Sequence, residues 1–214
     1  MKTKTMIRML VALVVLALAV PAWAQATIEG TWTTRAREND EGRRWAQVSL
    51  ELDDEHGTWG WSVDPDDLQG ISYEQLDGDV TDAHFEMVRD AGTVVFDGTI
   101  RSGRGVGTFA FTPNAQWQRD MERLGFDGLS QREAFSAAIH DITTAYVSDL
   151  RGLGFDDLDV DELFSFAIHG ISTDFIRGMN DLGYADIPAK KLVSMRIHGV
   201  TVDWVRQVRA AMGG

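Results

Sequence analysis

The chain has 214 residues and no cysteine, and its 20 Lys and Arg stand against 33 Asp and Glu, a formal net charge of −13. The absence of cysteine excludes disulfides, a thiol nucleophile and a lipid anchor on cysteine. The acid excess argues against binding to nucleic acid or anionic lipid by charge, because both need a basic patch.

Residues 1–24 have the pattern of a secretory signal peptide. Three basic residues precede an uninterrupted apolar run at 9–20, and Ala22-Trp23-Ala24 is an A-x-A cleavage pattern. The apolar run is too short to span a bilayer, for which ~20 residues are needed. We therefore expect an exported protein, periplasmic or secreted after cleavage near Ala24-Gln25, with no integral membrane segment in the mature chain.

Residues 26–112 predict an antiparallel β domain. Six runs rich in Val, Thr, Phe and Trp are bounded by Gly or Asp clusters. These candidate strands are 28–34, 45–52, 58–63, 84–89, 93–100 and 105–112. Short joints between the last three runs indicate hairpins, and the polar residues 64–81 indicate a long loop with a helical turn.

Residues 114–214 carry an internal repeat with a period of 29 residues. Equivalent positions hold an L-G-[FY] element, an I-H element and an aromatic residue. The repeat-defining residues, to which we assign structural roles, are Leu124, Leu153 and Leu182; Gly125, Gly154 and Gly183; His140, His169 and His198; and Tyr146, Phe175 and Trp204, with Trp117 in step with these aromatics. A fixed period near thirty residues is typical of stacked supersecondary units.

Each copy predicts two short helices. The first helix starts at Ser130, Asp159 or Pro188, and the second helix starts at Asn114, Thr143, Ser172 or Thr201; nearly all of these are good N-caps. Glycines follow both helices where a left-handed residue ends a helix, except that Asp141 replaces glycine after the first histidine. Apolar stripes including Leu163, Ile168 and Leu182 are expected to be buried between copies.

The predicted fold is therefore α+β, with an N-terminal antiparallel sheet of about six strands followed by an α-solenoid-like stack of four second helices and three first helices. The two halves meet at Thr112-Pro113-Asn114. Because this linker is short, we expect the helix that carries Trp117 to dock on the end of the sheet.

His140, His169 and His198 supply enough ligands for a catalytic zinc. However, equivalent positions in neighbouring repeats lie about 8–10 Å apart, whereas zinc–nitrogen bonds are about 2.0–2.1 Å. The spacing favours structural roles near helix ends, and we expect no metal.

Other motifs also favour a protein without catalytic chemistry. The acidic clusters at 64–67 and 156–162 do not fit the twelve-residue calcium loop. Gly103-x-Gly105-x-Gly107 is flanked by strands, which indicates a hairpin and no dinucleotide site. No G-x-S-x-G, H-E-x-x-H or Walker pattern occurs. We therefore expect no enzymatic activity and no cofactor.

Tryptophans are dense in the predicted sheet, at Trp32, Trp45, Trp59 and Trp61. We interpret them as core residues; the alternative is that some line a ligand face.

The pattern L-G-[FY] with I-H-G-[IV]-[ST]-x-[DE]-[FWY]-[IV]-R, across residues 154–177 and again at 182–206, resembles repeats of uncharacterised exported bacterial proteins. Similar repeats occur on the periplasmic side of membrane metallopeptidases of the beta-lactam-sensor (antirepressor) type. The resemblance carries no catalytic residue over, because the H-E-x-x-H motif and the membrane helices of those enzymes are absent. It implies an extracytoplasmic accessory or sensing module, with another envelope protein as the expected partner.

The alternative comes from Gly30-Thr31-Trp32, which is similar to the G-x-W that opens lipocalins. It implies a carrier that holds a small ligand in the β domain. An apolar pocket inside the sheet, lined by Trp45 or Trp59, would favour this carrier, and a filled interior would favour the interaction module.

Overall fold

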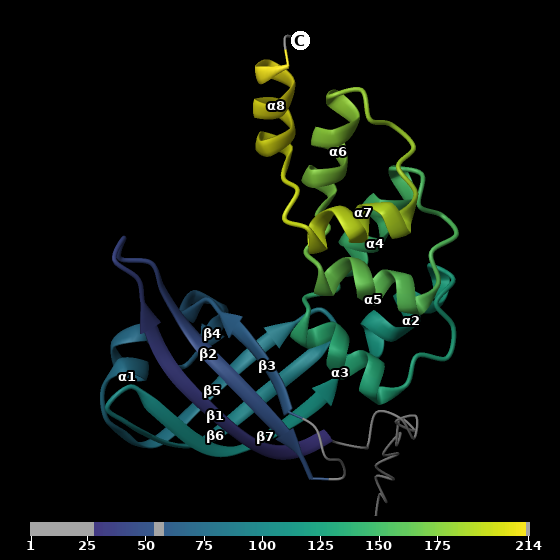
Figure 1. Ribbon diagram of the computed structural model, residues 1–214. Coiled ribbons are helices and arrows are strands. Elements are labelled where there is room, and N and C mark those ends of the chain that lie inside the picture. The colour runs from purple at the N-terminus through teal and green to yellow at the C-terminus, as the bar shows by residue number, and fades with distance from the viewer. Residues whose placement is uncertain (1–27, 54–57, 213–214) are drawn as a thin grey trace, which may run out of the picture.

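The structure is a computed structural model that describes residues 28–53 and 58–212. The predicted signal peptide and its cleavage point lie outside the described residues. The described chain forms a curled antiparallel sheet with helices at its ends, so the fold is mixed α+β (Figure 1).

The sheet has seven strands in the order β3-β2-β1-β7-β6-β5-β4. Their bounds are β1 Ile28–Glu38, β2 Arg44–Leu52, β3 Thr58–Val63, β4 Leu68–Gln69, β5 Val80–Arg89, β6 Gly92–Arg101 and β7 Arg104–Pro113. Two meanders, β1-β2-β3 and β5-β6-β7, are joined because the first strand pairs with the last long strand, with Ile28 opposite Phe111. Both expected hairpins, β5-β6 and β6-β7, are present.

The strand count differs from the expected six because β4 lies in the segment that we assigned to a loop. Only two residues pair there, Leu68 opposite Met87 and Gln69 opposite Glu86. A pair this short shows no alternation in the sequence. The rest of the segment contains the 3₁₀ turn η2 (Pro65–Asp67) and the expected helical turn, α1 (Tyr73–Asp77).

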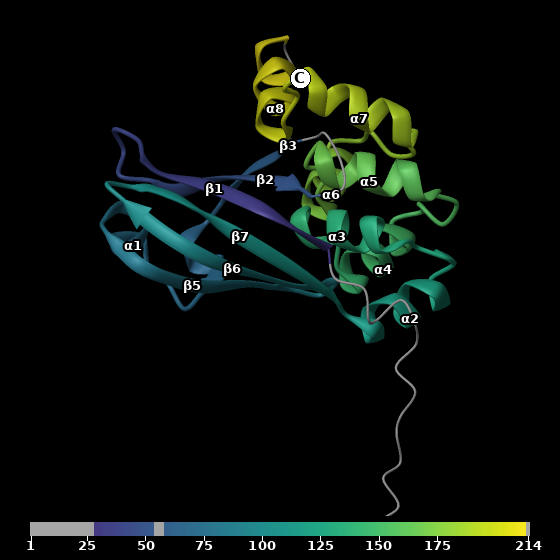
Figure 2. The ribbon, with the colours of Figure 1, turned by 90° about the horizontal axis from the view of Figure 1, so that it is seen from below.

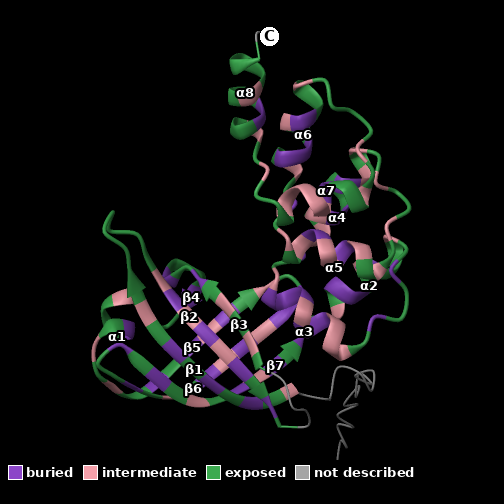
Figure 3. Ribbon diagram, viewed as in Figure 1, coloured by how far each residue is buried: buried purple, intermediate pink, exposed green. Residues whose placement is uncertain are grey.

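The interior of the curled sheet is filled by aromatic rings. Trp32 lies edge-on to Phe85 and Phe96 at centroid distances of 5.4 and 6.0 Å, and the two phenyl rings stack at 4.8 Å. All three side chains are fully buried. Leu76 of α1, also fully buried, belongs to the same core. Figure 3 shows buried residues alternating with more exposed residues along the strands.

Glycines make room for Trp32. A Cβ atom on Gly105 would lie 2.5 Å from the indole, and one on Gly107 would lie 2.7 Å from Nε1 and 1.9 Å from the Asp97 carbonyl oxygen. The indole Nε1 donates to that oxygen at 3.1 Å. The glycine pattern is therefore explained by a hairpin on which a tryptophan lies.

Seven helices follow the sheet in the described residues. They are α2 (Ala115–Arg123), α3 (Gln131–Ile139), α4 (Thr144–Gly152), α5 (Val160–Ile168), α6 (Thr173–Asp181), α7 (Ala189–Ile197) and α8 (Val202–Ala211). In Figures 1 and 2 they extend from one end of the sheet, and in Figure 1 α6 and α8 lie farthest from it. We call α3, α5 and α7 the first helices and α2, α4, α6 and α8 the second helices.

The helix ends follow the local chemistry of their sequences. Six predicted N-caps accept a backbone N–H on their side chains; Pro188 has no side chain that can do so. Gly125, Gly154 and Gly183 have φ of +81°, +92° and +85°, and Asp141 takes φ +53° in the place of a glycine. The N–H groups after these glycines bond back across the last turn, as in Phe126 N to Met121 O at 2.9 Å, which is a Schellman stop.

The sheet and the helices share one hydrophobic cluster. Phe135 of α3 stacks on Phe109 at 5.7 Å and contacts Phe111 and Trp59 at 5.2 and 5.7 Å. We expected the helix carrying Trp117 at this place. Trp117 instead donates to the carbonyl oxygen of Ile142 among the helices. The helix that contacts β1, β6 and β7 is α3, which buries five apolar residues.

Candidate docking site at the end of the helices

Equivalent helices lie against one another. Contacts join α2 with α4, α4 with α6, and α6 with α8, and α5 with α7. Gly178 of α6 lies so close to α8 that an added Cβ would be 2.7 Å from Val202. Each second helix therefore has the next second helix as a neighbour, up to α8.

One hydrogen bond recurs with the period of the sequence. Trp117 Nε1 donates to Ile142 O at 3.0 Å, and 29 residues later Tyr146 Oη donates to Ile171 O at 2.6 Å. Each acceptor is the carbonyl at the stop of the following first helix. The aromatic residue of a second helix thereby fixes the end of the next first helix.

The third copy makes the same connection with a different residue. Phe175 cannot donate a hydrogen bond, so the guanidinium of Arg196 lies over its ring at 5.2 Å and donates to Val200 O at 3.4 Å. The fourth aromatic, Trp204 of α8, has no acceptor for its Nε1 among residues 28–53 and 58–212.

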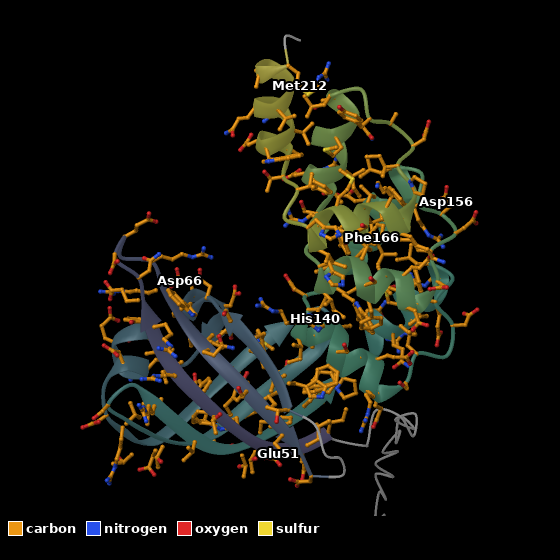
Figure 4. All side chains as sticks on the ribbon, in the orientation of Figure 1. Glu51, Asp66, His140, Asp156, Phe166 and Met212 are labelled. Carbon is orange, nitrogen blue, oxygen red and sulfur yellow. The ribbon has the colours of Figure 1, made fainter. Side chains whose placement is uncertain are left out.

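An apolar groove of about 620 Å³ lies beside Trp204, the aromatic residue that makes no such hydrogen bond within the described chain. We call it the terminal groove. It is formed by α7, α8 and the end of α6, and its lining residues are Met179, Tyr184, Ile187, Lys191, Met195, Val200, Trp204, Val205, Val208, Arg209 and Met212. Figure 4 shows Met212 at the far end of α8, while Phe166 lies inside the helical part.

Several groove residues are more exposed than their equivalents one repeat earlier. Phe175 on α6 is 6 % exposed, whereas Trp204 at the same position of α8 is 52 % exposed. Met179 is buried and its equivalent Val208 is half-buried; Phe166 is fully buried and its equivalent Met195 is half-buried. The difference follows from the neighbour: Arg196 of α7 lies over the Phe175 ring of α6, and no described helix follows α8.

The charge around the groove is opposite to that of the rest of the chain. Residues 182–214 carry five Lys and Arg against two acids, whereas residues 28–181 carry 12 against 31. Lys191 and Arg209 line the groove itself. Arg209 donates to Leu182 O, and Lys191 has no ion-pair partner in the described part of the chain.

The other repeat-defining residues lie at helix ends. Leu124, Leu153 and Leu182 follow the last turns of α2, α4 and α6, and all three are half-buried and pack against the core. Leu182, which we expected to be a core residue, therefore lies at the edge of the core, whereas Met179 is buried in it. Ile168 and Ile197 are wrong as core residues, at 53 % and 59 % exposure. In each helix the residue two positions earlier is more buried: Phe166 is fully buried, and Met195 is half-buried.

The three histidines are the C-cap residues that directly follow α3, α5 and α7, three separate helices. His140 lies near the sheet (Figure 4) and is half-buried, and this burial lowers its pKa. His169 is half-buried and His198 is exposed. Within residues 28–53 and 58–212, no group of three or more His, Asp or Glu could hold a metal ion. The structural role of these histidines stays a prediction.

The tryptophans of the sheet divide between its two sides. Trp32 is buried, and Trp59 and Trp61 pack against the core. Trp45 lies on the outer side, half-buried, beside polar residues that include Gln47 and Ser62. The core interpretation is therefore wrong for Trp45, because β2 places Ala46 and Val48 on the inner side.

The terminal groove was not foreseen from the sequence. The signal that could have revealed it is the basic charge of residues 182–214 together with apolar residues at Trp204, Val208 and Met212. No helix of the described residues has the length and apolar character needed to cross a bilayer.

No protein-family model matches the chain, and neither a curated protein nor a solved structure is detectably similar to it. The fold and the groove thus describe an α+β protein whose helices end in an open apolar surface.

Proposed function

We propose that this protein is a non-enzymatic, exported module of the bacterial envelope that contacts another protein, as an interaction or sensing accessory. In this proposal helices α2–α8 are an α-solenoid-like stack of 29-residue helix pairs. The terminal groove is the contact surface. Repeat stacks commonly present such surfaces to partners.

The single observation that carries the proposal is the exposure of the terminal groove. A contiguous apolar hollow, with Trp204 half-exposed and Met212 at 83 % exposure, is costly to leave in water. Tryptophan and methionine are enriched in the centres of protein interfaces. The groove is also rimmed by charged side chains, as interfaces are.

The carrier alternative receives less support. The inside of the sheet is filled by Trp32, Phe85 and Phe96, whose rings are in contact. Leu76 and Phe135 belong to the same buried cluster, from the helices α1 and α3 that contact the sheet. Trp45 and Trp59 do not enclose an apolar pocket there, since Trp45 is outside and Trp59 touches Phe135.

The place of action rests on two sequence features. The signal-peptide pattern of residues 1–24 supports export. The resemblance of the L-G-[FY] and I-H-G repeats to those of exported bacterial proteins and of beta-lactam-sensor (antirepressor) type metallopeptidases supports an envelope role.

The proposal is tested by photo-crosslinking in the bacterium that produces the protein. A benzophenone amino acid replaces Val208, inside the groove, and in a matched strain it replaces Gln207, which is exposed on the same helix outside the groove. We expect an adduct with one envelope protein from position 208 and none from position 207. Equal labelling at both positions, or no adduct at 208, would overturn the proposal.

A further inference from the structure

We infer that the terminal groove binds an amphipathic helix of a partner protein, in the position that the next first helix of the array would take, with acidic residues of its first turn facing Lys191. The inference rests on the proposed function of the groove as a contact surface. It adds the chemical nature and the placement of the partner segment.

The placement follows from the packing of α7 on α6. Leu192 of α7 is 1 % exposed and lines one hollow together with Ile176 and Met179 of α6. The equivalent residues of α8 are Val205 and Val208, which line the groove. A helix that presents a large apolar residue at the position of Leu192 therefore covers the same part of α8 that α7 covers on α6.

The hydrogen bonds of the earlier repeats indicate where the C-terminal end of such a helix lies. Trp117 and Tyr146 each donate to the carbonyl that follows the next first helix. Trp204 is the next donor in this series, and it lies half-exposed in the groove. A partner helix that ends in an open carbonyl near Trp204 satisfies the indole N–H.

The charge preference follows from the neighbouring pair of first helices. Lys190 at the start of α7 lines a hollow together with Asp161 and Glu162 at the start of α5. Acidic and basic first turns thus lie side by side. Lys191, the equivalent of Glu162, lines the next hollow and has no acidic neighbour of this kind in the described chain. An acidic first turn supplies that neighbour and also suits a helix N-terminus.

The chain itself provides a probe with this chemistry. A fluorescent peptide of residues 156–172, acetylated and amidated, contains the acidic first turn of α5, Leu163 at the position of Leu192, and the Ile171 carbonyl. Fluorescence anisotropy measures its binding to the mature full-length protein. We expect saturable binding that Val208→Asp weakens by more than tenfold.

Two further variants test the contacts. Trp204→Phe keeps an aromatic side chain but removes the N–H and one ring of the indole, which leaves the residue found naturally at Phe175. We expect binding weaker by about 3- to 10-fold. A peptide with Asp161→Lys binds the natural protein poorly, and Lys191→Glu restores its binding. Lys190→Glu changes the charge equally at a residue outside the groove and does not restore it. Circular dichroism confirms that each variant is folded.

The outcomes separate this inference from the proposed function. The inference is wrong if the peptide does not bind, if Val208→Asp and Trp204→Phe leave its binding unchanged, or if Lys191→Glu fails to rescue the charge-reversed peptide. A position-208 adduct with an envelope protein, obtained without peptide binding, would keep the proposed function and reject the acidic helix. Concentration-dependent dimerisation that Val208→Asp abolishes and the peptide does not compete with would assign the groove to a second copy and also reject it.

Discussion

Trp32 and the glycines beneath it make a strong residue-scale prediction. Alanine at Gly107 places a Cβ atom 1.9 Å from Asp97 O and 2.7 Å from Trp32 Nε1, with Trp32 fully buried. Overpacking of this kind costs about 1–3 kcal/mol. We expect Gly107→Ala to lower the free energy of unfolding by that amount in urea denaturation. Gly60→Ala, whose nearest contact is 3.5 Å, is the matched control and should stay within about 0.5 kcal/mol.

Two histidines make opposite contributions to the pH dependence of stability. Burial lowers the pKa of His140, so the stability from its neutral form is present above the unfolded pKa of about 6.5 and is lost as pH falls through the folded pKa. The hydrogen bond that the protonated His84 Nδ1 donates to Asp97 Oδ1, 2.7 Å away, and the negative charge of that carboxylate raise the pKa of His84. That contribution is present below about 6.5 and is lost as pH rises through the raised pKa.

Melting temperatures between pH 7.5 and 5.0 separate these two effects. Relative to the natural chain, His140→Gln should lose less stability as pH falls, because it removes a group that resists protonation. His84→Gln should lose more, because it removes a group that favours protonation. If the melting temperature of His140→Gln falls with pH as much as that of the natural chain, the role of His140 burial is contradicted.

At the residue scale, the sequence predicts the features that depend on neighbours along the chain. Ser130 and Glu133 form the capping box that their spacing indicates, and Asp159 and Ser172 cap α5 and α6. The packing of Trp32 against Gly105 and Gly107 could not be predicted from the sequence. Strands β1 and β7 are about seventy residues apart in the chain and meet only in the folded sheet.

At the scale of the elements, the bond between Tyr146 and the stop of α5 should be measurable. Tyr146→Phe removes the donor and leaves Ile171 O, at the end of a buried turn, without it. We expect a loss of about 1–2 kcal/mol in the free energy of unfolding. Phe175→Tyr adds the same hydroxyl one repeat later, where Val200 O already accepts from Arg196. That control should change stability by less than about 0.5 kcal/mol, and an equal loss in both variants would contradict the prediction.

The helices themselves follow from the 29-residue register, since caps and glycine stops recur in the sequence. The sequence specifies less well which face of each helix is buried. Phe164, Phe166 and Ile168 are all apolar, and only packing selects Phe166 for the interior and leaves Ile168 exposed. The two-residue strand β4 was not predicted for the same reason. Its pairing with β5 depends on tertiary structure and leaves no periodic pattern in the sequence.

At the scale of the whole molecule, the sequence indicates an antiparallel sheet followed by helices. It does not indicate how the sheet and the helices pack together. The pairing of β1 with β7 brings the start of the sheet next to the strand that leads into α2. The terminal groove likewise depends on three-dimensional facts: α7 covers α6, and α8 lacks such a cover in the described chain. A repeat pattern alone does not say which copy remains open.

Phe135 makes the central contact between the helices and the sheet. Its side chain is fully buried and contacts Phe109, Phe111 and Trp59 of the sheet from helix α3. Truncation of a buried Phe to Ala costs about 3–5 kcal/mol. Because Phe135→Ala removes contacts between the two parts and leaves the rings around Trp32 in place, we expect the helices to open at a lower free energy than the sheet.

Hydrogen exchange followed by mass spectrometry resolves this difference by comparing β6 with α5. In the natural chain both segments should share one opening free energy, and in Phe135→Ala α5 should exchange first. Phe96→Ala is the matched control, since Phe96 is as deeply buried but touches Trp32 and Phe85 inside the sheet. It should lower the protection of both segments together. Equal protection of β6 and α5 in Phe135→Ala would show that other contacts join the sheet to the helices.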